Sequence, residues 1–187
     1  MNSVPIRIID FVFALIGLIL TSPLLISVVV AGYFDTGHPI FFQKRVGRNQ
    51  RAFTLIKFRT MPMQTKSVAS HLVDASAITK FGILLRKTKI DELPQLINVI
   101  RGDMSLVGPR PNLFNQKELM EKREDHGVYA VLPGITGLAQ ISKIDMSTPL
   151  LLARTDQIMI SSFTLRNYFK YLVMTVIGKG SGDAIKS

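Results

Sequence analysis

The segment KIDELPQLINVIRGDMSLVGPRP (residues 89–111) places two carboxylates, Asp91 and Glu92, next to each other in the chain. Basic residues stand directly before them, at Arg86, Lys87 and Lys89. Nearby positive charge keeps a carboxylate ionised at neutral pH, and the start of a helix attracts phosphate. An ionised carboxylate beside a bound phosphate can attack the phosphorus or hold Mg²⁺. The pair is therefore a candidate site for phosphoryl chemistry, in which the second carboxylate completes a metal site or handles a proton.

A purely structural role explains the same pair. Apolar residues from Leu93 to Ile100 recur at helical spacing, and Pro94 is acceptable in the first turn of a helix. Asp91 is then expected to be the N-cap, and Glu92 to complement the helix dipole. The spacing fits capping and chemistry equally well.

Other cations are aimed by their local backbone. In FTLIKFRTM (residues 53–61) the two-residue period of a strand puts Lys57 and Arg59 on one face, roughly 7 Å apart. Such a pair suits an anion site, and it suits a solvated sheet edge equally well. Arg110 lies between two prolines, which restrict the backbone and aim one guanidinium in a geometry suited to a diphosphate.

The chain that carries these residues is both apolar and basic. It has 187 residues, 47% of them hydrophobic, with 23 Lys and Arg against 13 Asp and Glu and a net charge of +10. This length suits one domain with its own core. A basic balance suits an anionic partner, whether nucleic acid, anionic lipid or a phosphorylated small molecule. The chain has no cysteine, which excludes disulfides, thiolate metal sites and cysteine nucleophiles.

The most apolar segment runs from Ile8 to Phe34 and is nominally long enough to cross a bilayer. Ser22 and Pro23 interrupt it in the middle, where proline costs a regular helix ~3 kcal/mol. Each half is then about 12 residues or ~18 Å long, short of a ~30 Å hydrocarbon core. Basic residues flank both ends, so the positive-inside rule keeps both ends on the cytoplasmic side. The flanking residues are Arg7, Lys44, Arg45, Arg48 and Arg51.

We therefore expect residues 1–35 to form a re-entrant helix-break-helix that enters and leaves one face of the membrane. A kinked single span is the main alternative, because proline is tolerated in membrane helices when neighbouring groups bond the freed backbone. A cleaved signal peptide is another, although its apolar region should be only about 7–15 residues long.

The expected fold class is α+β and mostly helical. A short β-hairpin is predicted from residues 40–42 and 53–61, and amphipathic helices at the membrane interface from residues 67–86 and 165–176. Residues 36–177 are expected to form a catalytic region on the cytoplasmic face, in one domain with the membrane helix. The tail, residues 178–187, is expected to be flexible.

Three blocks, FQKRVGRNQRAFTLIKFRTM, KTKIDELPQLINVIRGDMSLVGPRP and LPGITGLAQ, resemble the motif blocks of the bacterial sugar transferase family. These are small monotopic phosphoglycosyl transferases that initiate surface-glycan assembly. The resemblance covers nearly the whole chain. It implies an enzyme of the bacterial inner membrane, active on the cytoplasmic face, that transfers a sugar 1-phosphate from a UDP-sugar to undecaprenyl phosphate and releases UMP.

The resemblance also implies roles for single residues. The family's aspartate nucleophile matches Asp91, which attacks the β-phosphorus to give a covalent phosphosugar intermediate in a ping-pong reaction, and its partner glutamate matches Glu92. The implied cofactor is Mg²⁺, held at Asp91. The implied substrate-binding residues are Lys57, Arg59, Arg86 and Arg110. Implied partners are the UDP-sugar, undecaprenyl phosphate, membrane lipid and downstream glycosyltransferases, with no nucleic acid.

The chain departs from the family pattern outside the acidic pair. Gln50 stands where a glycine is usual, and Leu132 and Leu138 stand where arginine and tryptophan are common. These changes concern sugar recognition, which the sequence does not specify. A membrane-tethered basic binding or scaffold protein without catalysis is the alternative function, although it gives no reason for a carboxylate pair among the cations.

Overall fold

A computed structural model of the chain describes residues 3–65 and 75–177. The tail predicted to be flexible lies outside the described residues. The α-helices are α1 (Val4–Thr36), α2 (Lys80–Thr88), α3 (Gln95–Arg101), α4 (Lys117–Asp125), α5 (Leu138–Ile141), α6 (Pro149–Ser161) and α7 (Leu165–Val176). Short 3-10 helices are η1 (Arg48–Gln50), η3 (Ala75–Ala77), η4 (Ile90–Glu92) and η5 (Val128–Ala130). The strands are β1 (Ile40–Val46), β2 (Ala52–Phe58), β3 (Ser105–Val107) and β4 (Gly134–Thr136). The predicted mostly helical α+β class is confirmed.

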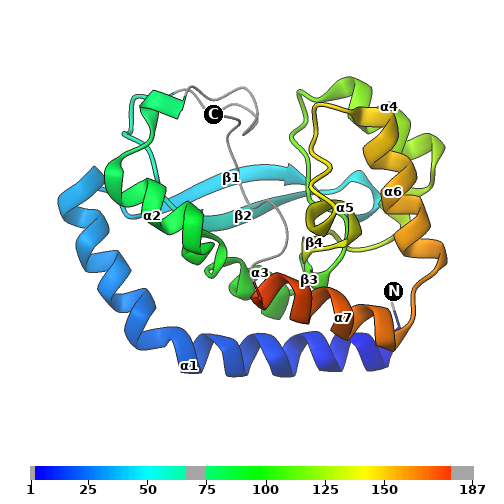
Figure 1. Cartoon of the computed structure of the whole chain (residues 1–187), viewed down its shortest axis with the longest axis horizontal. Helices are drawn as coiled ribbons and strands as arrows, with labels where there is room; N and C mark the ends of the chain where they lie inside the picture. The colour runs from blue at the N-terminus through cyan, green and yellow to red at the C-terminus, as the bar shows by residue number, and fades with distance from the viewer. Residues whose placement is uncertain (1–2, 66–74, 178–187) are drawn as a thin grey trace.

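The apolar N-terminal segment forms one helix, α1, that stays helical through Pro23. Proline has no N–H to donate to the carbonyl of Ile19, and the Ser22 hydroxyl donates to that carbonyl instead, at 2.8 Å. The predicted division into two helices is therefore not seen. Figure 1 shows instead that α1 changes direction partway along its length. It is long and apolar enough to cross a membrane, and only 11% of its most apolar window is buried.

The predicted hairpin is present as an antiparallel pair in which Ile40 lies opposite Phe58 and Val46 opposite Ala52. The first strand is longer than predicted and reaches Val46, whereas the second ends at Phe58. Asn49 and Gln50 close the loop with positive φ values of 54° and 56°. A left-handed backbone at Gln50 explains why glycine suits this position, because only glycine adopts it without steric cost.

A second sheet pairs β3 and β4 in parallel, with Ser105 opposite Gly134. The backbones of the two strands approach closely where β3 ends, and a Cβ added to Gly134 would lie 2.0 Å from the backbone nitrogen of Gly108. No side chain fits there. This close pairing fixes the start of the Gly-Pro-Arg-Pro loop that follows β3.

The predicted helix over residues 67–86 begins later than expected. Residues 66–74 lie outside the described part of the chain, and α2 starts at Lys80. Thr79 caps it, since its hydroxyl accepts from the Gly82 N–H at 2.8 Å. The same hydroxyl donates to Asp35 Oδ2 at 2.7 Å, which ties α2 to the end of α1.

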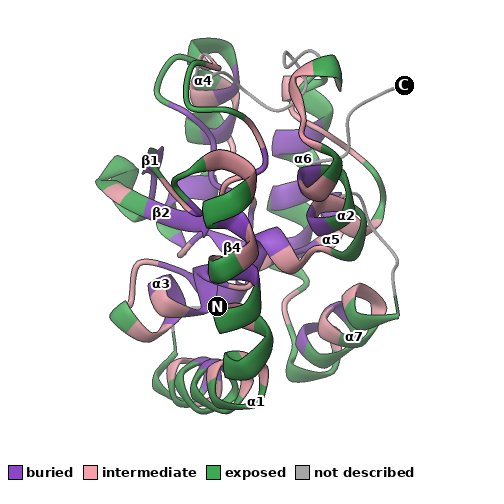
Figure 2. Cartoon of the chain, turned by 90° about the vertical axis from the view of Figure 1, so that its left-hand side faces the viewer, coloured by how far each residue is buried: buried purple, intermediate pink, exposed green. Residues whose placement is uncertain are grey.

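Figure 1 shows α2, α3 and α7 following one another across the middle of the molecule, with the bent α1 on one side of them. Figure 2 shows α1 and α7 at one end of the molecule and α4 at the opposite end. The two helices at the first end are in contact, because the Phe13 and Phe169 rings pack edge to face with centroids 6.1 Å apart. The predicted helix over residues 165–176 is confirmed as α7.

A buried acidic residue, Asp10, joins α1 to the rest of the fold. Its Oδ1 accepts hydrogen bonds from Ser105 Oγ at 3.0 Å, Leu106 N at 2.9 Å and Tyr168 Oη at 2.7 Å. Burial, together with the Asp10 carboxylate, raises the pKa of Tyr168 well above its ordinary value, so this hydroxyl remains a donor. Helix α1, strand β3 and helix α7 therefore meet at one carboxylate.

Candidate active site

The acidic pair lies in the turn between α2 and α3. Helix α2 ends at Thr88, Lys89 follows in a left-handed conformation with a φ of 59°, and η4 then carries both carboxylates. Asp91 is 1% exposed and Glu92 6%. The prediction that Asp91 is the N-cap of the next helix is wrong. Lys89 precedes η4, and Pro94 occupies the N-cap position of α3, because the chain makes a separate 3-10 turn between the two helices.

The loop after β3 brings Arg110 to the acidic pair. Arg110 Nη2 lies 2.6 Å from Glu92 Oε1, in a partly buried ion pair. Glu92 is largely withdrawn from water, and an ion pair in such a position is screened less by solvent than one at the surface. The guanidinium of Arg110, between its two prolines, is thus directed to the acidic pair Asp91 and Glu92, which we call the dyad.

A small pocket, partly open to solvent, lies beside Arg110. Its lining residues are Arg45, Leu55, Lys57, Gln95, Arg110 and Pro111. Three basic residues therefore line one small space beside the arginine that pairs with Glu92, and a positively charged lining of this kind attracts anions. Sequence reasoning missed Arg45 and Gln95. Extending the two-residue alternation of the hairpin back through Gln43 and Arg45 would have found the arginine, whereas nothing in the sequence singled out Gln95.

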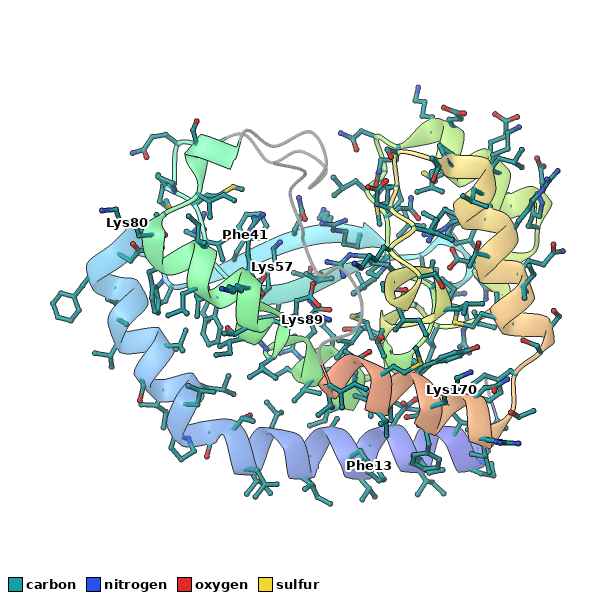
Figure 3. The ribbon with its side chains drawn as sticks, in the orientation of Figure 1. Phe13, Phe41, Lys57, Lys80, Lys89 and Lys170 are labelled. Carbon is teal, nitrogen blue, oxygen red and sulfur yellow. The ribbon has the colours of Figure 1, made fainter. Side chains whose placement is uncertain are left out.

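Of the four predicted substrate-binding cations, Lys57 and Arg110 line this pocket, whereas Arg59 and Arg86 do not. Lys57 Nζ and Arg59 Cζ lie 5.7 and 5.2 Å from the centroid of the Phe41 ring, which confirms that the two residues share a face. Figure 3 shows Lys57 beside Phe41 in the central part of the molecule. The Arg59 guanidinium donates to the carbonyl of His38 at 2.9 Å. It therefore lies against the start of β1.

Arg86 occupies the last turn of α2 and donates from Nε to Thr60 Oγ1 at 2.9 Å. This contact fixes the arginine against the end of the hairpin. Thr60 is itself buried, and through this hydrogen bond it supports one of the predicted cations.

The carboxylates offer the oxygen donors that Mg²⁺ prefers. Within residues 3–65 and 75–177, no group of three or more His, Cys, Asp or Glu side chains gathers to hold a metal ion by itself. Magnesium usually keeps several waters and binds through one or two carboxylates together with substrate phosphates. The donor set at Asp91 and Glu92 fits that arrangement, in which a diphosphate substrate completes the coordination.

Comparison with known proteins places this site in a family. The sequence profile of the bacterial sugar transferases matches residues 1–179. The chain belongs to this family. The profile spans α1, both sheets and the acidic pair, so the family assignment covers every part of the candidate site.

Several relatives of this sugar transferase are similar along most of its length. The sugar transferase EpsL of Bacillus subtilis is 43% identical over 137 residues, which cover 73% of this chain and 67% of EpsL. The exopolysaccharide production protein ExoY of Sinorhizobium fredii is 37% identical over 154 residues, covering 73% of this chain and 68% of ExoY. The UDP-glucose:undecaprenyl-phosphate glucose-1-phosphate transferase of Xanthomonas campestris is 33% identical over 174 residues, or 90% of this chain.

The relatives fall into two length classes. This chain spans about two thirds of EpsL and of ExoY. It spans about a third of the Xanthomonas transferase and of the similar proteins from Haemophilus influenzae and Erwinia amylovora.

Proposed function

We propose that this protein transfers a sugar 1-phosphate from a UDP-sugar to undecaprenyl phosphate and releases UMP. The observation that carries the proposal is the ion pair between Arg110 and Glu92, at 2.6 Å, next to the buried Asp91 in a chain of this family. The name of the Xanthomonas relative, a UDP-glucose:undecaprenyl-phosphate transferase, supports the substrate classes.

The proposed reaction has two displacements at the same phosphorus. A carboxylate oxygen of Asp91 attacks the β-phosphorus of the UDP-sugar, the bond from that phosphorus to the bridging oxygen breaks, and UMP leaves with the electron pair. The sugar phosphate is then held on Asp91 as an acyl phosphate. A phosphate oxygen of undecaprenyl phosphate attacks the same phosphorus, forms a diphosphate, and frees the Asp91 carboxylate.

The surrounding residues supply charge and position. Arg110 and Lys57 line the pocket beside the dyad and neutralise the diphosphate, and Arg86 and Arg59 extend the cationic surface along the hairpin. Glu92 either shares in binding the metal or handles a proton. Mg²⁺ bound through Asp91 and the substrate phosphates would add further neutralisation of charge.

We also propose that α1 is re-entrant and that the protein is monotopic in the bacterial inner membrane, with its site on the cytoplasmic face. The bend of α1, the exposure of its large apolar side chains and the basic residues on both flanks support this topology. Amphipathic α7 packs on α1 and exposes Leu165, Val173 and Val176, as expected of a helix at the interface. The site then lies where a polyprenyl phosphate presents its headgroup, and downstream glycosyltransferases would collect the product there.

Replacing Asp91 with asparagine tests the covalent mechanism. The amide has nearly the shape of the carboxylate but cannot form an acyl phosphate, so Asp91→Asn should fold and lose UMP release. Glu92→Gln should be severely impaired. Incubating the wild type with a panel of UDP-sugars and Mg²⁺, without acceptor, should add the mass of a sugar phosphate to a peptide that contains Asp91.

Two results would count against this proposal. A folded Asp91→Asn protein that releases UMP at the wild-type rate would rule out Asp91 as the nucleophile. Wild-type protein that releases no UMP from any UDP-sugar in the presence of undecaprenyl phosphate would favour the scaffold alternative.

A further inference from the structure

A second arginine, Arg123, lies buried behind the loop that carries Arg110. It is on α4, and its side chain is 2% exposed. Nη1 donates to the backbone carbonyl of Arg110 at 2.8 Å and to Asn112 Oδ1 at 3.0 Å. Nη2 donates to Asp156 Oδ2 on α6 at 2.7 Å. One planar guanidinium therefore connects two helices to the Gly-Pro-Arg-Pro loop.

Arg123 and Asp156 stand apart from the pocket that Arg110 and Lys57 line. Arg123 lines a second small hollow that borders the same loop and that Pro109, Pro111 and Tyr129 also line. Tyr129 adds to the support, since its hydroxyl donates to Asn112 Oδ1 at 3.0 Å. Arg110 borders both hollows, so its side chain faces the dyad while its carbonyl is held by Arg123.

The ion pair between Arg123 and Asp156 joins two helices at a high desolvation cost. Both side chains are withdrawn from water, and burial raises the pKa of Asp156 even though Arg123 acts in the opposite direction. Apolar side chains of similar size often stabilise a fold as well as a buried ion pair does. Apolar side chains cannot donate to a carbonyl, whereas arginine's rigid fork reaches Asp156 and the loop together.

We propose that Arg123, oriented by Asp156, is a positioning residue for Arg110 and sets how well Arg110 engages the diphosphate of the donor. Arg123 acts on the backbone at Arg110, and Arg110 in turn bonds Glu92. The kinetic part of this inference rests on the proposed transferase function. A purely structural Arg123 would hold α4 against α6 and affect catalysis only through overall stability.

The test uses Arg123→Lys, which keeps the charge but loses the fork that reaches both partners. Arg154→Lys is the matched control, because Arg154 is an exposed arginine on α6. KM for the UDP-sugar and kcat for UMP release are measured for both variants, in the wild type and in an Arg110→Ala background. Asp156→Asn serves as a second perturbation of the same contact, should Arg123→Lys fold poorly.

We expect Arg123→Lys to raise KM about tenfold with a smaller change in kcat, and Arg154→Lys to change neither by more than about twofold. In the Arg110→Ala background the effect of Arg123→Lys should fall to about twofold or less, because the side chain through which it acts is gone. An equal fold-change in both backgrounds would mean that Arg123 does not act through Arg110, and would overturn the proposal.

Hydrogen exchange provides a readout that needs no substrate. Amides in a peptide covering residues 108–113 should exchange faster in Arg123→Lys than in the wild type or in Arg154→Lys. Unchanged exchange there would overturn the proposal whatever the kinetics show. Failure of the transferase function itself would appear separately, as absent UMP release by the wild type, and the positioning role would then be judged on exchange alone.

Discussion

Contacts between distant residues define the candidate site at the level of single side chains. Sequence spacing correctly placed Lys57 and Arg59 on one face, because a strand's two-residue period is a local property. Spacing could not reveal that Arg110 reaches Glu92, since that pairing depends on how β3 and the loop after it return to the turn before α3. The N-cap prediction for Asp91 failed because a carboxylate just before a helix can lie either at the N-cap or in a separate 3-10 turn. The sequence does not distinguish the two.

The guanidinium groups of Arg110 and Arg59 have different partners. Arg110→Ala removes the ion pair with Glu92 and a wall of the pocket, whereas Arg59→Ala removes a guanidinium that donates to His38. We therefore expect Arg110→Ala to reduce kcat/KM for the UDP-sugar by roughly 100-fold, and Arg59→Ala by less.

The matched control for these cation variants is Thr54→Ala, an exposed position on β2. Thr60→Ala is unsuitable, because the Thr60 hydroxyl accepts from Arg86. A larger loss in Arg59→Ala than in Arg110→Ala would place the diphosphate nearer the start of β1.

The elements were predictable where their signals were local. The hairpin and α7 follow from strand and helix periodicity, and both are present. Periodicity did not locate the start of α2, which is set by the Thr79 cap. It also did not foresee that α1 would remain helical at Pro23, because the compensating bond from the Ser22 hydroxyl depends on a side-chain rotamer.

The fit of α2 against the hairpin yields a prediction at this scale. A Cβ on Gly82 would lie 2.3 Å from the carbonyl oxygen of Thr60, so Gly82→Ala must displace α2 and with it Arg86. We expect a lowered thermal midpoint together with a loss of UMP release of tenfold or more, as overpacking costs roughly 1–3 kcal/mol.

Gly127→Ala is the control that distinguishes the steric clash at Gly82 from the backbone strain that replacing a glycine can cause. Gly127 has a φ of +65° and no atom within 4 Å of an added Cβ, so the substitution introduces backbone strain alone. It should cost about 1–2 kcal/mol of stability and leave kcat/KM near the wild-type value. Equal losses of activity in the two variants would show that the placement of α2 is not critical to the site.

Charge and apolar surface are distributed unequally over the whole molecule. Helix α7 exposes large apolar side chains and carries Arg166 and Lys170 without any acidic residue. Helix α4, at the opposite end in Figure 2, carries the four acidic residues Glu118, Glu121, Glu124 and Asp125 together with the three basic residues Lys117, Lys122 and Arg123. Of these two helices, the one with the exposed apolar face is therefore the more basic, which composition alone indicated only as a sum of charges.

This polarity predicts a preference for anionic membranes. The protein should bind vesicles of phosphatidylglycerol more tightly than vesicles of phosphatidylcholine, and the difference should shrink as salt is raised. Arg166→Gln with Lys170→Gln should weaken binding to the anionic vesicles, in a flotation assay, by roughly 30-fold, at about 1 kcal/mol for each of the two charges. Lys117→Gln with Lys122→Gln on α4 is the control, and the same loss there would refute an oriented contact.

The re-entrant topology predicts that both ends of α1 face the cytoplasm. Single cysteines at Asn2 and Asn49 can be labelled selectively, because the native chain has no cysteine. Both should resist a membrane-impermeant reagent in whole cells and react after the membrane is opened. Labelling of position 2 alone from outside would establish a full span.

The buried contacts of Asp10 have a consequence for biogenesis. Its three donors lie 95, 96 and 158 residues later in the chain, so the carboxylate leaves the ribosome long before any of them exists. Asp10 lies near the start of the nascent apolar helix, where an aspartate opposes insertion by less than the about 3 kcal/mol that translocon scales give at a helix centre. Until translation supplies Ser105 and Tyr168, the emerging helix therefore has a reason to stay near the surface of the bilayer. The same helix fused to an unrelated passenger protein would lack these three donors, so its insertion into the membrane should differ from that of α1 in this protein.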